Sequence, residues 1–209
     1  VAIYSTFLQR AYDQMIHDIM IQNLDVLLAI DRAGIVGADG ETHQGIYDIS
    51  FLRILPNIVL MTPSNEQELW MMLNTGLKYK GIGAVRYPRG FTEGLDLDLN
   101  DECLQIGKSK TIVRGSKIAY LVFGTLLNEV TEVAMNNGAT VIDMRFVKPI
   151  DEKTIIAICQ THEYIFTIED NVILGGAGSA VNEVVNKNKI TKNIVNIGVP
   201  DSVVPHGNQ

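Results

Sequence analysis

The sequence predicts an α/β fold made of two consecutive parallel-sheet domains. Short, nearly all-apolar runs alternate with segments of helical periodicity, a pattern typical of parallel strands covered by helices on both faces. An acidic stretch without a strong period, Phe91–Cys103, interrupts the alternation and indicates a surface linker. The length of 209 residues suits two domains of about 100 residues each. We therefore expect one domain at residues 1–102 and a second at residues 103–209.

In the first half, apolar runs predict strands at Val1–Tyr4, Asp25–Ile30, Ile58–Met61 and Gly83–Arg86. Apolar residues at helical spacing predict one helix over Thr6–Asn23, with Thr6 as its N-cap. A second helix is expected to begin in a capping box formed by Ser64 and Gln67 and to run to about Lys80.

In the second half, strands are expected at Ile118–Phe123, Thr140–Met144, Tyr164–Ile168 and Ile194–Ile197. Helices are expected at Leu127–Asn137, Glu152–Thr161 and Gly178–Lys187. The pair Asn137-Gly138 is a helix stop, and Pro149 followed by Asp151 is a helix start. Since open parallel sheets bind ligands at the carboxyl ends of their strands, the residues that follow each strand are the first candidates for a site.

The composition excludes several classes of protein. Two cysteines, Cys103 and Cys159, are too few for a disulfide framework or a four-cysteine zinc site. A formal net charge of −7 argues against nucleic-acid binding, and no apolar run reaches the roughly 18 residues of a membrane span. The opening Val-Ala-Ile-Tyr is typical of the middle of a strand, so we expect the sequence to be a piece of a longer protein.

Tyr4, Phe7 and Arg10 follow the first expected strand. Phe7 and Arg10 lie one helical turn apart on the same face, so an aromatic ring and a guanidinium group could together hold a flat heterocycle. The alternative is a pair of core aromatic residues beside a solvated arginine.

The segment after the second strand, Asp31–Gly45, carries the strongest functional signal. It contains four glycines together with Arg32, Asp39 and His43, and it is longer than the usual connection of about 2–6 residues between a strand and a helix. His43 can donate, accept or transfer a proton near neutral pH. We interpret the segment as a functional loop; the alternative is a loop that is merely folded on its own hydrogen bonds.

After the fourth strand comes Arg86-Tyr87-Pro88-Arg89-Gly90. Two arginines around a rigid turn suit a clamp for a phosphate or a carboxylate, and Arg32 is expected at a neighbouring strand end.

Five segments resemble 1-deoxy-D-xylulose-5-phosphate synthases, a family of the transketolase superfamily. The segments are Tyr4–Gln14, Asp31–Gly45, Val85–Gly90, Met144–Asp151 and Gly175–Ser179. The Asp31–Gly45 loop is the most specific of them, because the wider superfamily shares the architecture but not this loop.

The resemblance implies a transferase that condenses pyruvate with glyceraldehyde 3-phosphate, with decarboxylation, to 1-deoxy-D-xylulose 5-phosphate. This reaction belongs to the methylerythritol phosphate pathway of isoprenoid biosynthesis and also supplies thiamine biosynthesis; it uses thiamine diphosphate and Mg²⁺. The chain would cover most of the pyrimidine-binding domain and most of the C-terminal domain, each truncated. The diphosphate and metal ligands and the Glu that activates the aminopyrimidine are expected outside it, so the piece alone is expected to be inactive. A homodimer located in the cytoplasm, or in a plastid or apicoplast of a eukaryote, is implied as well.

The resemblance also implies roles for single residues. Phe7 would stack on the aminopyrimidine of the cofactor, and Arg10 would lie beside it. Arg32 and Arg89 would hold the phosphate of the acceptor. The implied catalytic residues, which would contact the pyruvate-derived intermediate or the acceptor, are Tyr4, Asp39 and His43. Tyr4 and Asp39 would also bind substrate.

Two further patterns are weaker. Ala38-Asp39-Gly40, with Asn65 further on, loosely resembles a Gly-Asp-Gly…Asn magnesium motif, but Ala38 replaces the first glycine and Asn65 lies in a helix-capping run, so no metal ligand is expected in the chain. Gly175–Ser179 lacks the Gly-x-Gly-x-x-Gly spacing, and we expect it to form a tight turn into a packed helix.

Other functions remain open at this point. A β-type subunit of a 2-oxoacid dehydrogenase and a transketolase proper share the two-domain layout, and the Asp31–Gly45 loop distinguishes them. A non-catalytic core that only dimerises is a second alternative. A flavodoxin-like binding module is a third, and it leaves the long loop unexplained.

Overall fold

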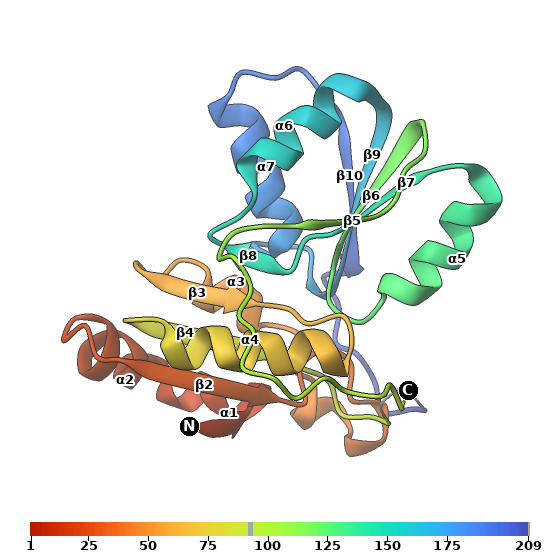
Figure 1. Cartoon of the computed structure of the whole chain (residues 1–209). Helices are drawn as coiled ribbons and strands as arrows, with labels where there is room; N and C mark the ends of the chain where they lie inside the picture. Colours follow the sequence, from red (N-terminus) through yellow and green to blue (C-terminus); the bar gives the residue numbers. More distant parts are fainter. Residues whose placement is uncertain (92–93, 209) are drawn as a thin grey trace.

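The computed structural model describes residues 1–91 and 94–208 and contains two five-stranded sheets, one in each half of the molecule (Figure 1). In spatial order, the first sheet consists of β1 (Ala2–Tyr4), β2 (Val26–Asp31), β4 (Ile82–Arg86), β3 (Ile58–Met61) and β8 (Phe146–Lys148). The second consists of β10 (Ile194–Val199), β9 (His162–Val172), β6 (Lys117–Phe123), β7 (Thr140–Asp143) and β5 (Lys110–Val113). The predicted α/β fold is confirmed.

Seven α-helices are described, together with several short helical turns. The α-helices are α1 (Ser5–Leu8), α2 (Tyr12–Gln14), α3 (Asp48–Leu52), α4 (Glu66–Lys78), α5 (Leu127–Asn137), α6 (Glu152–Thr161) and α7 (Ala177–Lys187). The turns are the 3₁₀ segments η1 (Gln9–Ala11), η3 (Gly37–Asp39) and η4 (Glu41–His43) and the π-helix η2 (Met15–Met20).

Apolar side chains cover both faces of each sheet. On the first sheet, Met72 of α4 packs on one face with Val85, while Leu8 and Ile49 lie on the other face. On the second sheet, α6 and α7 cover one face and α5 covers the other (Figure 1).

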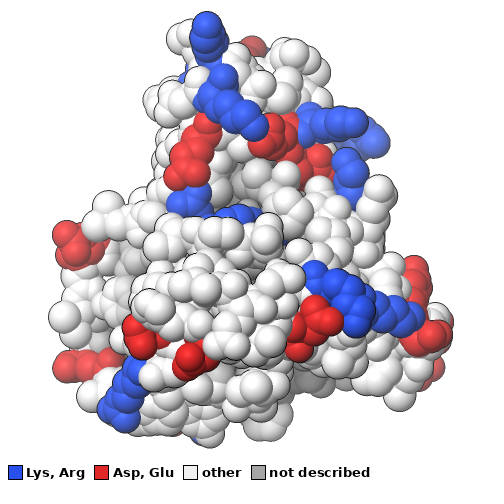
Figure 2. All heavy atoms as spheres, turned by 90° about the vertical axis from the view of Figure 1, so that its left-hand side faces the viewer, with Lys and Arg blue, Asp and Glu red and all other residues white. Residues whose placement is uncertain are grey.

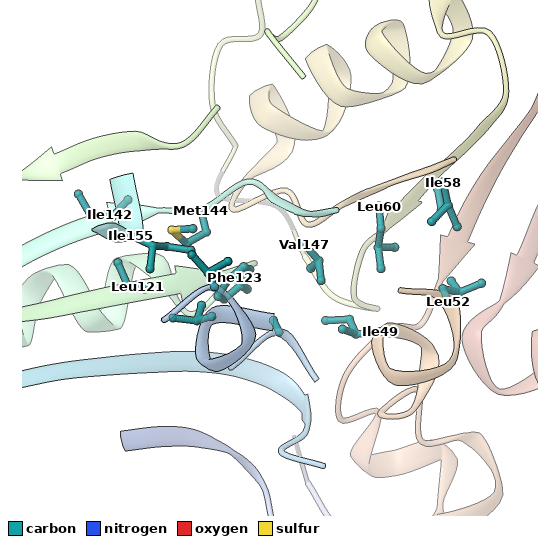
Figure 3. Close-up of a cluster of buried hydrophobic side chains, with 14 of the residues drawn as sticks. Ile49, Leu52, Ile58, Leu60, Leu121, Phe123, Ile142, Met144, Val147 and Ile155 are labelled. Atoms are coloured by element: carbon teal, nitrogen blue, oxygen red, sulfur yellow. The ribbon is translucent and has the colours of Figure 1, made fainter. Parts of the chain in front are cut away.

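One apolar core runs through both halves of the molecule. Figure 3 shows Ile49 and Leu60 from the first half next to Val147 from the second, in a single cluster of buried side chains that also contains Leu52 and Phe123. Strand β8, which follows the second sheet's β7 in the chain, lies in the first sheet and pairs with β3. The two sheets are therefore held together by packing as well as by the chain, while the predicted boundary at residues 102 and 103 stays a prediction.

Both sheets depart from the prediction at one edge. Strands β1, β2, β4 and β3 are parallel, but β8 runs antiparallel to β3. In the second sheet β5 runs antiparallel to β7, beside otherwise parallel strands. These two antiparallel edge strands, β5 and β8, were not among the predicted strands; both are short, and each pairs with a strand distant in the chain.

The predicted helix over Thr6–Asn23 is divided into α1, η1, α2 and η2. The spacing of apolar residues predicts which face of a helical segment is buried. It does not distinguish α-helical turns from 3₁₀ or π turns, because all three can bury the same face. Thr6 is not the N-cap: Tyr4 holds that position, and the Thr6 hydroxyl donates to the carbonyl oxygen of Thr42 at 2.8 Å.

The predicted capping box at Ser64 and Gln67 was also wrong. Asn65 caps α4 by accepting a hydrogen bond from the backbone N–H of Glu68, at 2.9 Å. Gln67 instead donates to Asp98 in the predicted linker, at 3.1 Å. The described part of that linker, residue 91 and residues 94–103, forms no helix or strand; residues 92 and 93 lie outside the described residues.

Positive and negative side chains are interspersed on the face shown in Figure 2, and the residues drawn there form no broad basic surface. Within the described ranges, 1–91 and 94–208, no helix has the length and apolar character needed to cross a membrane.

Candidate active site

The register of the first sheet brings three strand ends together. Tyr4 at the end of β1 is paired with Asp31 at the end of β2, and Ile30 of β2 is paired with Arg86 at the end of β4. The segments that follow these strands are the ones singled out in the sequence, so they emerge side by side at one edge of the sheet.

The Asp31–Gly45 loop is closed at its base by two backbone hydrogen bonds. The N–H of Gly34 donates to the oxygen of Gly45 at 2.7 Å, and the N–H of Gly45 donates to the oxygen of Gly34 at 2.9 Å. Gly34 has φ of +78°, which favours glycine, and a Cβ on Gly45 would collide with the carbonyl oxygen of Arg32 and lie 2.9 Å from the Cα of Ala33. Glycine is therefore required where the two ends of the loop meet.

Two arginines converge on one carboxylate inside this loop. Arg89 Nη1 lies 2.7 Å from Oδ1 of Asp39, and Arg32 Nη1 forms an ion pair with Oδ2 of the same residue. The Arg32 guanidinium also lies over the ring of Tyr4, 4.3 Å from the ring centroid. Asp39 thus holds two cations in place next to an aromatic ring.

Aromatic side chains continue the cluster from Tyr4. The rings of Tyr4 and Phe7 are stacked with centroids 5.4 Å apart, and His43 meets Phe7 edge-on at 5.5 Å. Arg10 lies over the Phe7 ring at 5.7 Å, and Phe7 is 38% exposed. His43 Nδ1 lies 3.0 Å from the hydroxyl oxygen of Thr42. The cluster presents an accessible aromatic ring flanked by an imidazole and a guanidinium group.

The structure thus brings all the predicted site residues into one chain of contacts. From end to end, the order is Arg89, Asp39, Arg32, Tyr4 and Phe7, with Arg10 and His43 both on Phe7. This places the residues; their individual roles stay predictions.

A groove of about 860 Å³ opens beside Arg89. It runs between the last residue of β2, the segment that follows β4, the start of α4 and the start of α5. Its lining residues are Asp31, Pro63, Ser64, Asn65, Glu66, Leu69, Tyr87, Pro88, Arg89, Gly90, Phe91, Thr125, Leu126 and Glu129. Among the predicted site residues, Arg89 is the one that reaches this groove within the described part of the chain.

Arg86, which the sequence suggested as half of an anion clamp, is committed elsewhere. Its side chain is 2% exposed; Nε donates to Asp48 at 2.8 Å, Nη1 donates to Asp170, and Nη2 donates to the oxygen of Gly45 at 3.3 Å. Burial alone would lower the pKa of Arg86, but the carboxylates of Asp170 and Asp48 outweigh it and hold the pKa above its ordinary value. Arg86 therefore remains a cation bound to the protein itself, and the clamp suggested for Arg86 and Arg89 was wrong.

The predicted tight turn at Gly175–Ser179 does lead into a packed helix, α7. The acceptor at its N-terminus is the protein's own Glu169, whose carboxyl oxygens accept hydrogen bonds from the N–H groups of Ala177 at 2.7 Å and Gly178 at 2.8 Å. Burial raises the pKa of Glu169 to about 7, against the lowering effect of these two donors. Glu169 belongs to the polar run Glu169–Asn171 near the end of β9, and such a run gives no sign in the sequence that one of its carboxyl groups is buried.

Asp39 and Asn65, the two residues of the loose magnesium pattern, have other partners. Asp39 binds two arginines, and Asn65 caps α4. In the described parts of the chain, no group of three or more His, Cys, Asp or Glu side chains is arranged to hold a metal ion.

Comparisons with known proteins identify both halves of the chain. Residues 1–93 match the transketolase pyrimidine-binding domain, and residues 107–209 match the transketolase C-terminal domain. A solved structure described as a split-gene transketolase, an inactive β4 tetramer, superposes with a TM-score of 0.85 at 24% identity, covering 97% of this chain and 67% of that one. At this identity the likeness supports the fold.

Curated relatives are similar along the entire chain. 1-Deoxy-D-xylulose-5-phosphate synthases of Pasteurella multocida, Idiomarina loihiensis and Vibrio campbellii are 59%, 56% and 53% identical, each over 100% of this chain and 34% of the relative. The chain therefore belongs to the family of 1-deoxy-D-xylulose-5-phosphate synthases, within the transketolase superfamily, and it spans about one third of the length of these relatives.

Proposed function

We propose that this chain is the acceptor-binding and pyrimidine-facing part of a 1-deoxy-D-xylulose-5-phosphate synthase. The full protein would condense pyruvate with glyceraldehyde 3-phosphate, with loss of carbon dioxide, to 1-deoxy-D-xylulose 5-phosphate. The observation that carries the proposal is the convergence of Arg32 and Arg89 on Asp39, next to the exposed aromatic cluster at Phe7.

The residues present fit one end of thiamine diphosphate. Phe7 offers an accessible ring for the aminopyrimidine, with Arg10 beside it. The diphosphate and Mg²⁺ ligands would come from segments outside this chain. When bound, the cofactor supplies the carbanion chemistry of the reaction.

Arg32 and Arg89 would bind the phosphate group of the acceptor. A phosphate dianion carries more charge than a carboxylate and offers three oxygens to two guanidinium groups, so it would compete with Asp39 for both arginines. Asp39 would then be released to accept a hydrogen bond from an acceptor hydroxyl, and phosphate capture would be coupled to decarboxylation. Such coupling would delay the loss of carbon dioxide until the acceptor is in place.

His43 and Tyr4 would serve the reacting end of the substrate. The His43 ring contacts the Phe7 ring edge-on. An acceptor held by Arg32 and Arg89 would there come close to the aminopyrimidine of the cofactor. Its imidazole would donate or accept a proton at the acceptor carbonyl, and the Tyr4 hydroxyl would hydrogen-bond the pyruvate-derived carboxylate. We also propose that the full protein is a homodimer in the cytoplasm.

Product analysis of the full-length protein tests this function. With thiamine diphosphate, Mg²⁺, pyruvate and glyceraldehyde 3-phosphate, we expect carbon dioxide and 1-deoxy-D-xylulose 5-phosphate. Transfer of the acyl group to a lipoyl acceptor would favour the β-type 2-oxoacid dehydrogenase instead. Transfer of a ketol unit from a sugar phosphate, with no consumption of pyruvate, would favour a transketolase.

A further inference from the structure

The Asp31–Gly45 loop rests on a buried ionic cluster whose members come from both halves of the molecule. Arg86 lies at the end of β4 and Asp48 at the start of α3, both in the first half, while Asp170 lies in β9 of the second sheet. The Arg86–Asp48 pair is almost completely buried, at 2% and 0% exposure. A buried cation with two carboxylate partners holds its geometry strongly, because losing one partner leaves a charge without compensation.

Arg86 and Asp170 both touch the base of the loop. Arg86 Nη2 donates to the carbonyl oxygen of Gly45, one of the two residues that close the loop. Asp170 lies so close to Gly34, the other closing residue, that a Cβ there would collide with its carboxylate and lie 3.0 Å from its Cγ. The two glycines that join the ends of the loop are thus held between Arg86 on one side and Asp170 on the other.

Neighbouring residues of β9 extend this support. The N–H of Val172 donates to the oxygen of Ile46 at 2.8 Å, and the Asn171 side chain accepts from the N–H of Ile49 at 3.2 Å. The last residues of β9 therefore hold the segment that follows the loop, Ile46–Ile49, as well as the Gly34–Gly45 closure.

We propose that Asp170, acting through Arg86, is a positioning residue that sets the geometry of the acceptor-phosphate site from the second sheet. Because Arg32 and Asp39 both lie on the loop, a shift of the Gly34–Gly45 closure would displace them relative to Arg89, which lies on a different segment. The inference rests on the proposed function, and it assigns to the C-terminal half a part in recognising the phosphate, although neither Asp170 nor Arg86 would touch the substrate.

The test uses Asp170→Asn and Arg86→Lys in the full-length protein. Asp170→Asn keeps the shape and an acceptor oxygen, and Arg86→Lys keeps the charge but replaces three donor nitrogens with one. The matched control is Glu183→Gln, which breaks another ion pair between the two halves, Arg53–Glu183 at 2.5 Å, in which Glu183 is 67% exposed.

The readout is the ratio of kcat/KM for glyceraldehyde 3-phosphate to kcat/KM for unphosphorylated glyceraldehyde. We expect this ratio to fall by about tenfold or more in both variants, because misplacement of the phosphate-binding arginines by an ångström is enough for such losses. Glu183→Gln should keep the parental ratio. A merely structural role would lower both activities together and leave the ratio unchanged.

The other outcomes are equally decisive. If the parent prefers the phosphorylated acceptor and Arg89→Ala abolishes that preference, but Asp170→Asn and Arg86→Lys retain it, the inference is wrong and the proposed function stands. Failure of either variant to fold, while Glu183→Gln folds, would show a structural cluster and would also overturn the inference. A parent without any preference for the phosphorylated acceptor would contradict the proposed function itself.

Discussion

Replacing Glu169 by Gln should remove a pH-dependent loss of stability. Glu169 is 2% exposed, and its carboxylate accepts hydrogen bonds from the N–H groups of Ala177 and Gly178 at the start of α7. Burial raises the pKa of this carboxyl from 4.5 to about 7 in the folded protein. Between these two values, the folded state retains a proton that the unfolded state has lost, so stability is fully present at low pH and falls as pH rises through 7.

The size of this effect follows from the two pKa values. A difference of 2.5 units between 4.5 and about 7 corresponds to about 3 kcal/mol over the whole range. Between pH 5.5 and pH 8, which avoids the isoelectric region near 5.0, the loss amounts to about 2 kcal/mol. Glutamine carries no titrating proton, so the stability of the variant should not show this fall with pH. The variant also loses one of the two oxygen acceptors for the N–H groups.

Urea unfolding followed by circular dichroism at several pH values measures the difference. Relative to the parent, Glu169→Gln should gain about 2 kcal/mol between pH 5.5 and pH 8, whatever its stability at the lower pH. Glu163→Gln, at an exposed position of the same strand, is the matched control and should follow the parent. Parallel pH profiles for Glu169→Gln and the parent would refute the reasoning.

Two further substitutions test the loop and the shared core. Gly45→Ala should destabilise the protein by about 1–3 kcal/mol or more and disrupt the loop, because its Cβ would collide with the carbonyl oxygen of Arg32. The control is Gly90→Ala, which has open space around it and should change the stability little. Equal melting temperatures for the two variants would contradict this. Phe146→Ala should lower the free energy of unfolding in urea by about 3–5 kcal/mol, because Phe146 of β8 is fully buried in the first sheet. The control is Phe91→Ala at an exposed position, which should change this free energy by less than about 0.5 kcal/mol. A small loss for Phe146→Ala would mean that β8 does not pack as described.

Elements with local start and stop signals could be predicted closely. Helices α5 and α6 have the predicted bounds, because Gly138 ends the first in a left-handed conformation and Asp151 caps the second by accepting from the N–H of Thr154. The site residues were found for a related reason: each lies at the end of a strand of the first sheet or in the segment that follows it, and the parallel register brings strand ends to one edge.

Features that depend on distant partners could not be predicted. Arg86 looked like a ligand-binding residue because its carboxylate partners lie 38 and 84 positions away, at Asp48 and Asp170. The same holds for the end of β9: the predicted strand stops at Ile168, whereas β9 continues to Val172 and includes Glu169 and Asp170, whose partners lie elsewhere in the chain. Strand β8 is a third case, since its pairing with β3 joins residues near 61 and 146.

The role of the two converging arginines is open to a direct kinetic measurement on Arg89→Ala in the full-length protein. Losing one charged hydrogen-bonding partner of a phosphate, worth about 1.5–3 kcal/mol, should raise KM for glyceraldehyde 3-phosphate by roughly tenfold to a hundredfold. KM for pyruvate should stay within twofold, because Arg89 lies at the far end of the contact chain from Phe7. An unchanged KM for glyceraldehyde 3-phosphate, or an equal rise for both substrates, would contradict the assignment of this loop and Arg89 to the acceptor phosphate.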